Sequence, residues 1–218
     1  MLSPSMMCQD LCNIRETLDI FEKEKIEYLH IDVMDGCFVP NFALGCDYIK
    51  SLRKATRIPL DIHLMIEEPD RKLDFFEIGE NDIVSVHLES TRHIHRALSA
   101  IRQRGAKPFV AINPGTAIVN IEQVLGVADG VLLMTVNPGF AGQKMTENSL
   151  EKIANTRSFL SERGKGDLLI EVDGNCSFEN LPLMKKSGAD IFVLGSSSVF
   201  AKSSSISENI KKVRDLVK

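Results

Sequence analysis

The sequence has no excess of positive charge and no long apolar run, and each absence excludes a class of protein. It contains 26 Lys and Arg against 30 Asp and Glu, so its formal charge is −4 with histidine neutral, and its pI is near 5.8. Nucleic acids and anionic membrane surfaces attract clustered positive charge, so we expect neither as a partner. No apolar run approaches the ~18 residues that a membrane-spanning helix requires. We therefore expect no nucleic acid and no membrane among its partners.

Targeting and disulfide signals are also lacking. The first five residues carry no basic side chain, and Asp10 and Glu16 follow soon after, which fits neither a secretory signal nor a transit peptide. The five cysteines are odd in number, irregularly spaced and without a C-x-x-C pair. This usage is typical of reduced thiols, so we expect a cytoplasmic protein.

No Pro/Ser-rich linker or charge block divides the chain. Short runs rich in β-branched residues or leucine alternate with amphipathic stretches, and these runs are residues 2–5, 27–34, 59–65, 82–89, 108–113, 130–136, 167–173 and 190–195. Glycines 79, 105, 126 and 188 each end an amphipathic stretch, where a helix C-cap belongs. Strands alternating with helices indicate a parallel sheet, and eight such units close a barrel. We predict a single-domain α/β protein, a (β/α)8 TIM barrel over residues 1–218. The alternative, an open doubly wound sheet, lacks a G-x-G-x-x-G after its first strand.

Each predicted strand separates into two columns of side chains, because successive residues point to opposite faces. In the run 27–34, one column is apolar and the other contains ionisable residues, and three further runs repeat this pattern. The ionisable columns are His30, Asp32 and Met34; Asp61, His63 and Met65; Ser85, His87 and Glu89; and Leu169, Glu171 and Asp173. If the apolar columns face the helices, these columns point into the barrel. A polar interior is costly unless its groups are paired or bind a cation.

Four of these residues lie near the C-terminal ends of their strands, where barrel proteins have their functional sites. They are His30, Asp32, His63 and Asp173. Two imidazoles and two carboxylates suit one divalent metal ion, such as Zn²⁺, Mn²⁺, Co²⁺, Fe²⁺ or Mg²⁺. A hydrogen-bonded network without metal is the alternative, which four converging residues disfavour. We interpret His87 and Glu89 as structural polar groups.

Asp32 and Asp173 have a second possible task. Carboxylates on opposite sides of a cavity can act as an acid and base pair across a bound substrate. Met34, Met65 and Met134 occupy rim positions of three inward columns. Singly, each is better interpreted as a core residue that fills a gap, but together they could cover an electron-rich intermediate and exclude water.

Three glycine-containing loops follow the last predicted strands, at residues 137–143, 173–175 and 195–198. Backbone N–H groups at the start of short helices bind phosphate, and barrels commonly use the loops after strands seven and eight for this purpose. The loops therefore indicate a phosphorylated ligand, which a local positive field can bind even though the whole chain is acidic.

Four segments resemble the signature segments of the ribulose-phosphate 3-epimerase family. They are residues 30–41 (HIDVMDGCFVPN), 61–65 (DIHLM), 134–143 (MTVNPGFAGQ) and 171–174 (EVDG). The similarity extends from Leu2 to near the C-terminus. It implies a barrel of the ribulose-phosphate-binding type and a metal-dependent isomerase that inverts C3 of a phosphorylated ketose.

The resemblance also implies roles for individual residues. His30, Asp32, His63 and Asp173 would bind the metal, and Asp32 and Asp173 would be the catalytic acid and base. One aspartate would remove the C3 proton to give a cis-enediolate, and the other would return a proton to the opposite face. The metal would neutralise the developing charge, and the three methionines would shield the intermediate. Substrate and its phosphate would contact Ser5, His63, Gly139, Phe140, Ala141, Gly142, Gly174, Asn175, Gly195 and Ser196.

Departures from the common family pattern bear on the substrate. Many members have glycine where Ala141 and Asn175 stand, and histidine is common where Cys37 stands. Residues 3–11, 140–143 and 173–176 are more similar to the D-allulose-6-phosphate 3-epimerase branch. We therefore expect conversion of D-allulose 6-phosphate to D-fructose 6-phosphate, with D-ribulose 5-phosphate to D-xylulose 5-phosphate, a pentose phosphate pathway reaction, as the alternative.

Two other functions are less favoured. A Schiff-base aldolase needs a lysine at an inner strand end, and no rim column supplies one. A non-catalytic phospho-sugar-binding barrel would not need two histidines and two aspartates together. We expect a homo-oligomer that binds a phosphorylated ketose.

Overall fold

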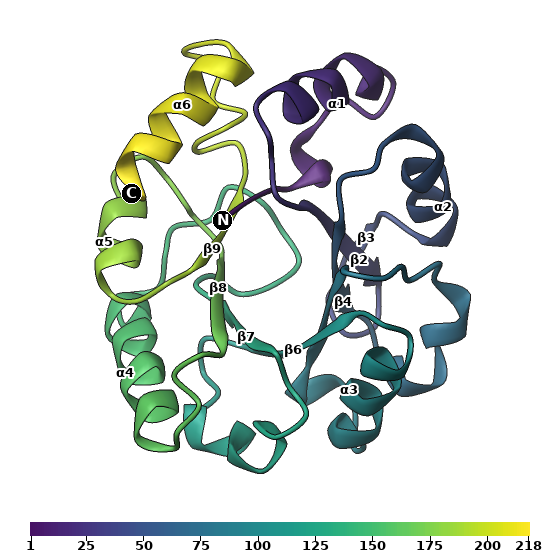
Figure 1. Cartoon of the computed structure of the whole chain (residues 1–218), viewed down its shortest axis with the longest axis vertical. Helices are drawn as coiled ribbons and strands as arrows, with labels where there is room; N and C mark the ends of the chain where they lie inside the picture. The colour runs from purple at the N-terminus through teal and green to yellow at the C-terminus, as the bar shows by residue number, and fades with distance from the viewer.

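A computed structural model describes residues 1–218 and shows one curled sheet of nine strands surrounded by helices (Figure 1). The strand order is β1-β9-β8-β7-β6-β5-β4-β2-β3. The strands are β1 (Leu2–Pro4), β2 (Leu29–Asp35), β3 (Phe42–Ala43), β4 (Leu60–Met65), β5 (Ile83–His87), β6 (Lys107–Ile112), β7 (Gly130–Met134), β8 (Leu169–Asp173) and β9 (Ile191–Leu194). All neighbours pair in parallel except the short β3, which pairs antiparallel with the end of β2.

The sheet closes between β1 and β2. Ser5 forms a parallel bridge with His30, and the Tyr28 N–H donates to the Leu2 carbonyl at 3.3 Å. Since β1 also pairs with β9, eight parallel strands form a ring, as Figure 1 shows from one end. The predicted single-domain (β/α)8 barrel is therefore confirmed.

Six α-helices cover the outside of the ring: α1 (Ile14–Lys23), α2 (Cys46–Ala55), α3 (Ile94–Gln103), α4 (Ser149–Glu162), α5 (Leu181–Lys186) and α6 (Ile206–Leu216). Two connections differ from the prediction because they contain only 3-10 helices, namely η2 (Pro69–Arg71) and η3 (Leu73–Phe75) after β4, and η5 (Ile118–Val124) after β6. Two further 3-10 turns, η1 (Met6–Cys8) and η4 (Leu88–Ser90), follow β1 and β5.

The predicted glycine caps are present after α-helices and absent where a connection contains only 3-10 helices. Gly105 and Gly188 have φ of +82° and +110° after α3 and α5, so both predictions are confirmed. The prediction of α-helix caps at Gly79 and Gly126 is wrong, because the element directly before each of them is a 3-10 helix. Gly79 belongs instead to the turn before β5, where its N–H donates to Asp82 Oδ2 at 2.7 Å.

Apolar side chains pack in three separate clusters. The largest fills the layer between sheet and helices and includes the outward column Leu29, Ile31 and Val33 of β2. A second closes the bottom of the barrel, formed by Tyr28, Ile83, Phe109 and Ile191. A third, Met34, Val39 and Met65, lies at the opposite rim. The predicted polar columns therefore form a buried layer between two apolar clusters.

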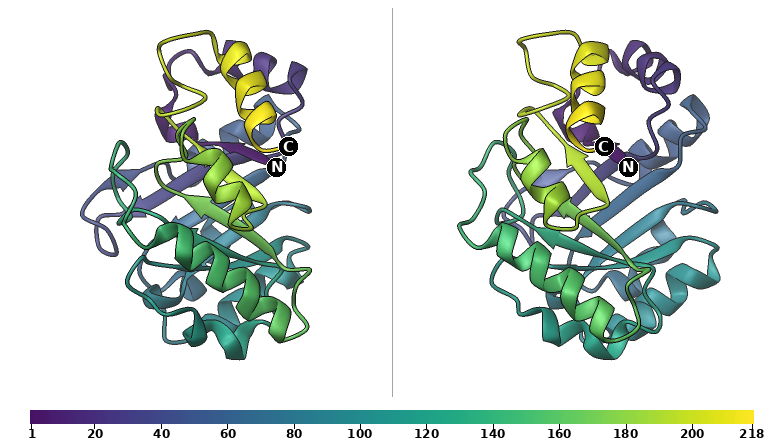
Figure 2. Two further views of the ribbon diagram at one scale, coloured as in Figure 1. Left: turned by 90° about the vertical axis from the view of Figure 1, so that its left-hand side faces the viewer. Right: turned by 60° about the vertical axis from the view of Figure 1, so that its left-hand side comes forward.

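The loops after β2 and β7 project from the same end of the barrel, on the left of the left-hand view in Figure 2. Asn41 in the first loop donates through Nδ2 to the Gly139 carbonyl in the second at 2.7 Å. At the chain's ends, Arg214 of α6 pairs with Glu27 at 3.0 Å, beside α1. No helix combines the length and the apolar character that crossing a membrane would need.

Candidate metal centre and substrate cavity

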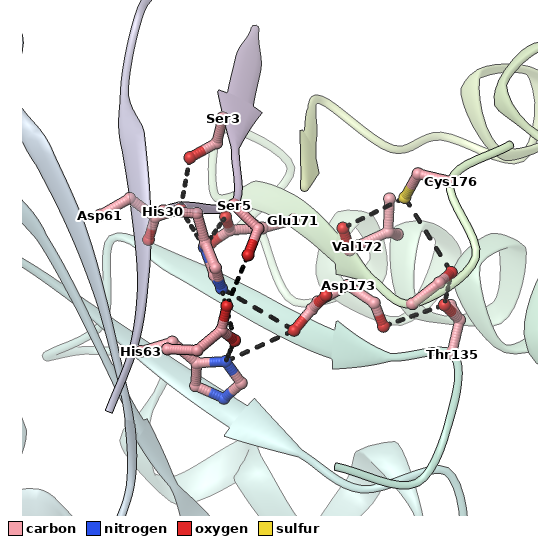
Figure 3. Close-up of polar contacts among 12 residues, drawn as sticks. Ser3, Ser5, His30, Asp61, His63, Thr135, Glu171, Val172, Asp173 and Cys176 are labelled. Carbon is pink, nitrogen blue, oxygen red and sulfur yellow. Dashed lines mark hydrogen bonds and ion pairs between the residues drawn. The ribbon is translucent and has the colours of Figure 1, made fainter. Parts of the chain in front are cut away.

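The four predicted metal ligands converge inside the barrel, from β2, β4 and β8. Figure 3 shows three of them, His30, His63 and Asp173, close together. His30 Nε2 lies 3.4 Å from Asp32 Oδ1 and 3.8 Å from Asp173 Oδ2. His63 Nδ1 lies 3.4 Å from Asp173 Oδ2 and 3.8 Å from Asp32 Oδ1. Each histidine nitrogen therefore faces both carboxylates, and the four atoms lie within 4.8 Å of one another.

This donor set fits a divalent metal ion. A tetrahedral site with metal–ligand bonds of about 2.0–2.1 Å would separate its ligand atoms by about 3.4 Å. The contacts above are close to that separation. His30 Nε2 and His63 Nδ1 are also buried without any hydrogen-bond partner. Buried polar atoms in native proteins normally have partners, and a cation bound among these four atoms would satisfy both nitrogens.

Local charge favours a cation as well. Burial alone would lower the pKa of His30, but Asp61 and Asp32 raise it well above its ordinary value. Burial would likewise raise the pKa of Asp32, but His30 and His63 lower it to about 2. The negative field that holds a proton on His30 also favours a metal ion at the same place.

Three residues without an assigned role support His30 from its other side. Asp61 Oδ2 lies 2.6 Å from His30 Nδ1, and Ser3 Oγ donates to the same oxygen at 2.7 Å. Glu171 Oε1 lies 3.8 Å from His30 Nδ1, and burial together with the charge of Asp61 raises the pKa of Glu171 well above its ordinary value. The sequence could have indicated Asp61 and Glu171 as neighbours of the metal site, because both belong to the same inward columns as the predicted ligands.

A cavity of about 290 Å³ opens beside the two aspartates. Its volume suits a small molecule. Of the predicted site residues, those that line the cavity are Ser5, Asp32, Met34, Met65, Met134, Gly139, Phe140, Ala141, Gly142, Asp173, Gly174, Asn175, Gly195 and Ser196. His30 and His63 are fully buried and are not part of the lining. Ser5 Oγ donates to Asp32 Oδ2 at 2.7 Å, so it orients one of the carboxylates.

Nine further residues line the cavity and were not among the individually predicted site residues. These residues are Met7, Cys8, Val136, Asn137, Pro138, Gln143, Cys176, Val193 and Ser197. Several belong to the predicted glycine-containing loops. Met7 and Cys8 belong to η1, a single turn without a periodic pattern, so periodicity did not place them in the cavity, although they lie in the segment 3–11 that bears on the substrate. Met7 packs with Met34 and Met65 at the rim.

The loop after β8 has a strict backbone requirement. Gly174 has φ +121°, and a Cβ there would lie 2.7 Å from Val136 Cγ2. Asn175 follows in the left-handed region with φ +48°, which asparagine tolerates better than most residues. Its Nδ2 donates to the Gln143 carbonyl at 2.6 Å, and Asn180 Nδ2 donates to Asn175 Oδ1 at 2.8 Å. Asn175 therefore joins the loops after β7 and β8.

Comparison with known proteins agrees with this geometry. Residues 1–200 match the model of the ribulose-phosphate 3 epimerase family. The chain is 45% identical over 195 residues to ribulose-phosphate 3-epimerase of Bacillus subtilis (strain 168), covering 89% of this chain and 90% of that one. It is 41% identical over 218 residues to the enzyme of the same name from Aquifex aeolicus (strain VF5), covering 100% and 96% of the two chains. It is 42% identical over 204 residues to a chloroplastic ribulose-5-phosphate-3-epimerase of Arabidopsis thaliana, covering 92% and 72%.

Among solved structures, 3-hexulose-6-phosphate synthase from Salmonella typhimurium superposes with a TM-score of 0.70 over 99% of this chain and 97% of the other. The two sequences are 14% identical, so this likeness concerns the fold alone. Family match, identity to the relatives and the His/Asp cluster agree with one another. The chain therefore belongs to the ribulose-phosphate 3-epimerase family and is a divalent-metal-dependent enzyme of the isomerase class.

Proposed function

We propose that this epimerase interconverts D-ribulose 5-phosphate and D-xylulose 5-phosphate, and that residues 1–218 form one barrel domain that carries the whole site. The observation that carries the proposal is the convergence of His30, Asp32, His63 and Asp173 beside a small cavity. The relatives described above are named for ribulose phosphate, which supports the five-carbon substrate. They do not support D-allulose 6-phosphate, the substrate that we expected first from the sequence.

The structure offers a physical reason for the main sequence departure that favoured the six-carbon substrate. Asn175 stands where a left-handed backbone is needed. Its side-chain amide forms hydrogen bonds with the protein itself, at Gln143 and Asn180. Its presence is thus explained without a longer ligand. D-allulose 6-phosphate remains the alternative that the experiment below must compare.

Asp32 and Asp173 would perform the proton transfers at C3. One carboxylate accepts the C3 proton from one face of the substrate, and the other donates a proton to the opposite face. Their roles exchange when the reaction runs in reverse. Asp32 is held ionised, with a pKa of about 2, and oriented by Ser5. A divalent ion held by His30, Asp32, His63 and Asp173 would supply positive charge to stabilise negative charge on the substrate oxygens.

The remaining lining residues would exclude water and hold the phosphate. Met34, Met65 and Met134 are all buried at the rim, and their apolar side chains would cover the reacting carbons. N–H groups of the loops that contain Gly139, Gly142, Gly174, Gly195 and Ser196 would bind the phosphate oxygens. Each loop lines the same cavity, so one small substrate can reach both the carboxylates and the loops.

The decisive comparison is the ratio of kcat/KM for D-ribulose 5-phosphate and D-allulose 6-phosphate, each with and without a chelator. We expect a preference of about tenfold or more for the pentulose phosphate, because a longer chain would misplace either the phosphate or C3, and we expect the chelator to abolish both activities. The opposite ratio would establish the six-carbon alternative. Binding of both compounds without turnover would instead support a non-catalytic barrel.

A further inference from the structure

The two ring nitrogens of His63 face different surroundings. Nδ1 faces Asp32 and Asp173 and has no hydrogen-bond partner. Nε2 lies 2.8 Å from Nε2 of His87, and the two rings stack with centroids 5.0 Å apart. Between two nitrogens at this distance one must donate a proton and the other must accept it. The contact therefore links the tautomer of His63 to the tautomer of His87.

Glu89 decides the direction of that hydrogen bond. Its Oε2 lies 3.3 Å from His87 Nδ1, and an ionised carboxylate only accepts. Nδ1 of His87 therefore carries the proton, and its Nε2 presents a lone pair. His63 must then donate from its own Nε2, which leaves the lone pair of its Nδ1 directed toward Asp32 and Asp173.

The protonation states of both partners agree with this arrangement. The His87 ring is fully buried, which disfavours a charged imidazolium, so the ring has only one N–H. Burial alone would raise the pKa of Glu89, but hydrogen bonds from His87, Thr116 and Asn113 lower it to about 2. Phe38 lies against the His87 ring, with centroids 4.8 Å apart, and helps to exclude water from it.

Glu89 is itself held from outside the barrel. The Asn113 N–H donates to its Oε1 at 2.8 Å, and the Thr116 hydroxyl donates to the same oxygen. Lys152 of α4 fixes that loop, because its ammonium donates to the carbonyls of Asn113 at 2.6 Å, Pro114 at 3.1 Å and Thr116 at 2.8 Å. A continuous set of contacts thus leads from α4 to His63.

We propose that His87 and Glu89 are positioning residues that fix the tautomer of His63, so that its Nδ1 offers a lone pair to the metal ion. The need is electrostatic. Asp32 and Asp173 would otherwise draw a proton onto Nδ1, and a protonated nitrogen cannot bind metal. For His30 the corresponding task falls to Asp61 directly, at 2.6 Å. This inference rests on the proposed metal site and adds the residues that prepare one ligand for it.

The first test needs no substitution. Two-bond ¹H–¹⁵N correlation spectra of the full chain, metal-free and loaded with Zn²⁺, report which nitrogen of each histidine carries a proton. We expect His87 to be the Nδ1–H tautomer in both states and His63 to bear its proton on Nε2 when Zn²⁺ is bound. A His87 that carries its proton on Nε2 would overturn the proposal.

The second test measures Zn²⁺ affinity by competition with a chelator. His87→Leu removes the acceptor, whereas His87→Gln restores one through its amide oxygen. We expect about 10–100-fold weaker binding for His87→Leu and a change of about threefold or less for His87→Gln. His95→Gln, at an exposed position on α3, is the matched control and should bind as the wild type does. Unchanged affinity in a folded His87→Leu protein would overturn the inference.

His63→Gln separates this inference from the metal site on which it rests. If His63→Gln weakens Zn²⁺ binding while His87→Leu does not, only the role of His87 and Glu89 is wrong. If His63→Gln also leaves binding unchanged, the metal site itself is wrong and the inference falls with it. Thermal unfolding of each variant checks that it is folded, and if His87→Leu is not, the wild-type spectra decide.

Discussion

Asp32 and Asp173 face one cavity from different strands, and their surroundings differ. The Asp32 side chain is 6% exposed and accepts from Ser5, whereas the Asp173 side chain is 16% exposed. Both lie beside the two histidines, so either carboxylate can contact a metal ion and a substrate held in the cavity. Their shared position, rather than any property of one aspartate, suits them to a two-sided proton transfer.

Asp173→Asn should reduce kcat by about 10²–10⁴-fold while substrate still binds, because an amide cannot accept or return the C3 proton. Turnover is measured with D-ribulose 5-phosphate, and binding by titration calorimetry. Asp19→Asn, an exposed carboxylate on α1, is the matched control and should retain full activity. Undiminished turnover in Asp173→Asn would contradict its catalytic role.

Gly174→Ala should destabilise the protein by about 2–4 kcal/mol, because the new Cβ would lie 2.7 Å from Val136 Cγ2 and 2.8 Å from Thr135 Oγ1 at a backbone φ of +121°. The free energy of unfolding from denaturant titration measures this effect. Gly126→Ala is the control, since nothing lies within 4 Å of its added Cβ. Equal stability of the two variants would show that the turn after β8 relaxes freely.

At the scale of the element, the end of β2 is fixed by one side chain. Asp35 Oδ1 accepts from the N–H groups of Cys37 and Phe38, and Oδ2 accepts from the N–H of Glu67 and from Lys72. Asp35 therefore joins the loop after β2 to the loop after β4. These two strands carry three of the four candidate metal ligands.

Asp35→Asn should lower the free energy of unfolding by about 1–3 kcal/mol at pH 7, because its amide cannot accept on both sides. Burial alone would raise the pKa of Asp35, but hydrogen bonds from the N–H groups of Cys37, Phe38 and Glu67 and from the Lys72 side chain lower it from 3.8 to about 2. A carboxyl group whose pKa is lower in the folded than in the unfolded protein stabilises the fold at pH values above its unfolded pKa. This stabilisation is lost as the pH falls through the folded pKa. The difference between wild type and variant should therefore be complete above about pH 4 and vanish toward pH 2. A difference that persists unchanged at pH 2 would refute this account.

Individual strands were predictable because their two columns differ so clearly. In β2 the apolar column must face the helices and the polar column must face the barrel interior. The structure has this arrangement, with Leu29, Ile31 and Val33 outside and His30 and Asp32 inside. The connection after β4 was not predictable in the same way. Its two short 3-10 helices bury Pro69 and Leu73 through local turns that follow no helical period. Pairings between strands, such as Asp61 with His30, depend on register, which periodicity within one strand does not report.

At the scale of the whole molecule, the barrel holds a buried polar layer between an apolar floor and an apolar rim. Such a layer is unfavourable unless its groups are mutually satisfied. Ser3, Asp61 and His87 form hydrogen bonds within this layer. The atoms in it that have no hydrogen-bond partner include His30 Nε2, His63 Nδ1, Ser85 Oγ and both carboxyl oxygens of Glu171. A cation bound between the two histidines and the two aspartates would satisfy both ring nitrogens.

Metal binding should stabilise the whole barrel. A metal ion at a free concentration 100 times its dissociation constant should raise the free energy of unfolding by about 2.7 kcal/mol, and a chelator should remove the gain. Denaturant titrations of wild type and His30→Gln at equal Zn²⁺ concentration test this. Equal stabilisation of both proteins would place the bound metal elsewhere.

The most direct test of the central claim follows the C3 proton itself. D-ribulose 5-phosphate is incubated with the enzyme in D₂O, with and without chelator, and the products are examined by NMR. We predict D-xylulose 5-phosphate that carries solvent deuterium at C3, formed by the wild type only when metal is present. Formation of the product with the original hydrogen retained at C3, or at an unchanged rate with chelator, would contradict a metal-dependent proton transfer between Asp32 and Asp173.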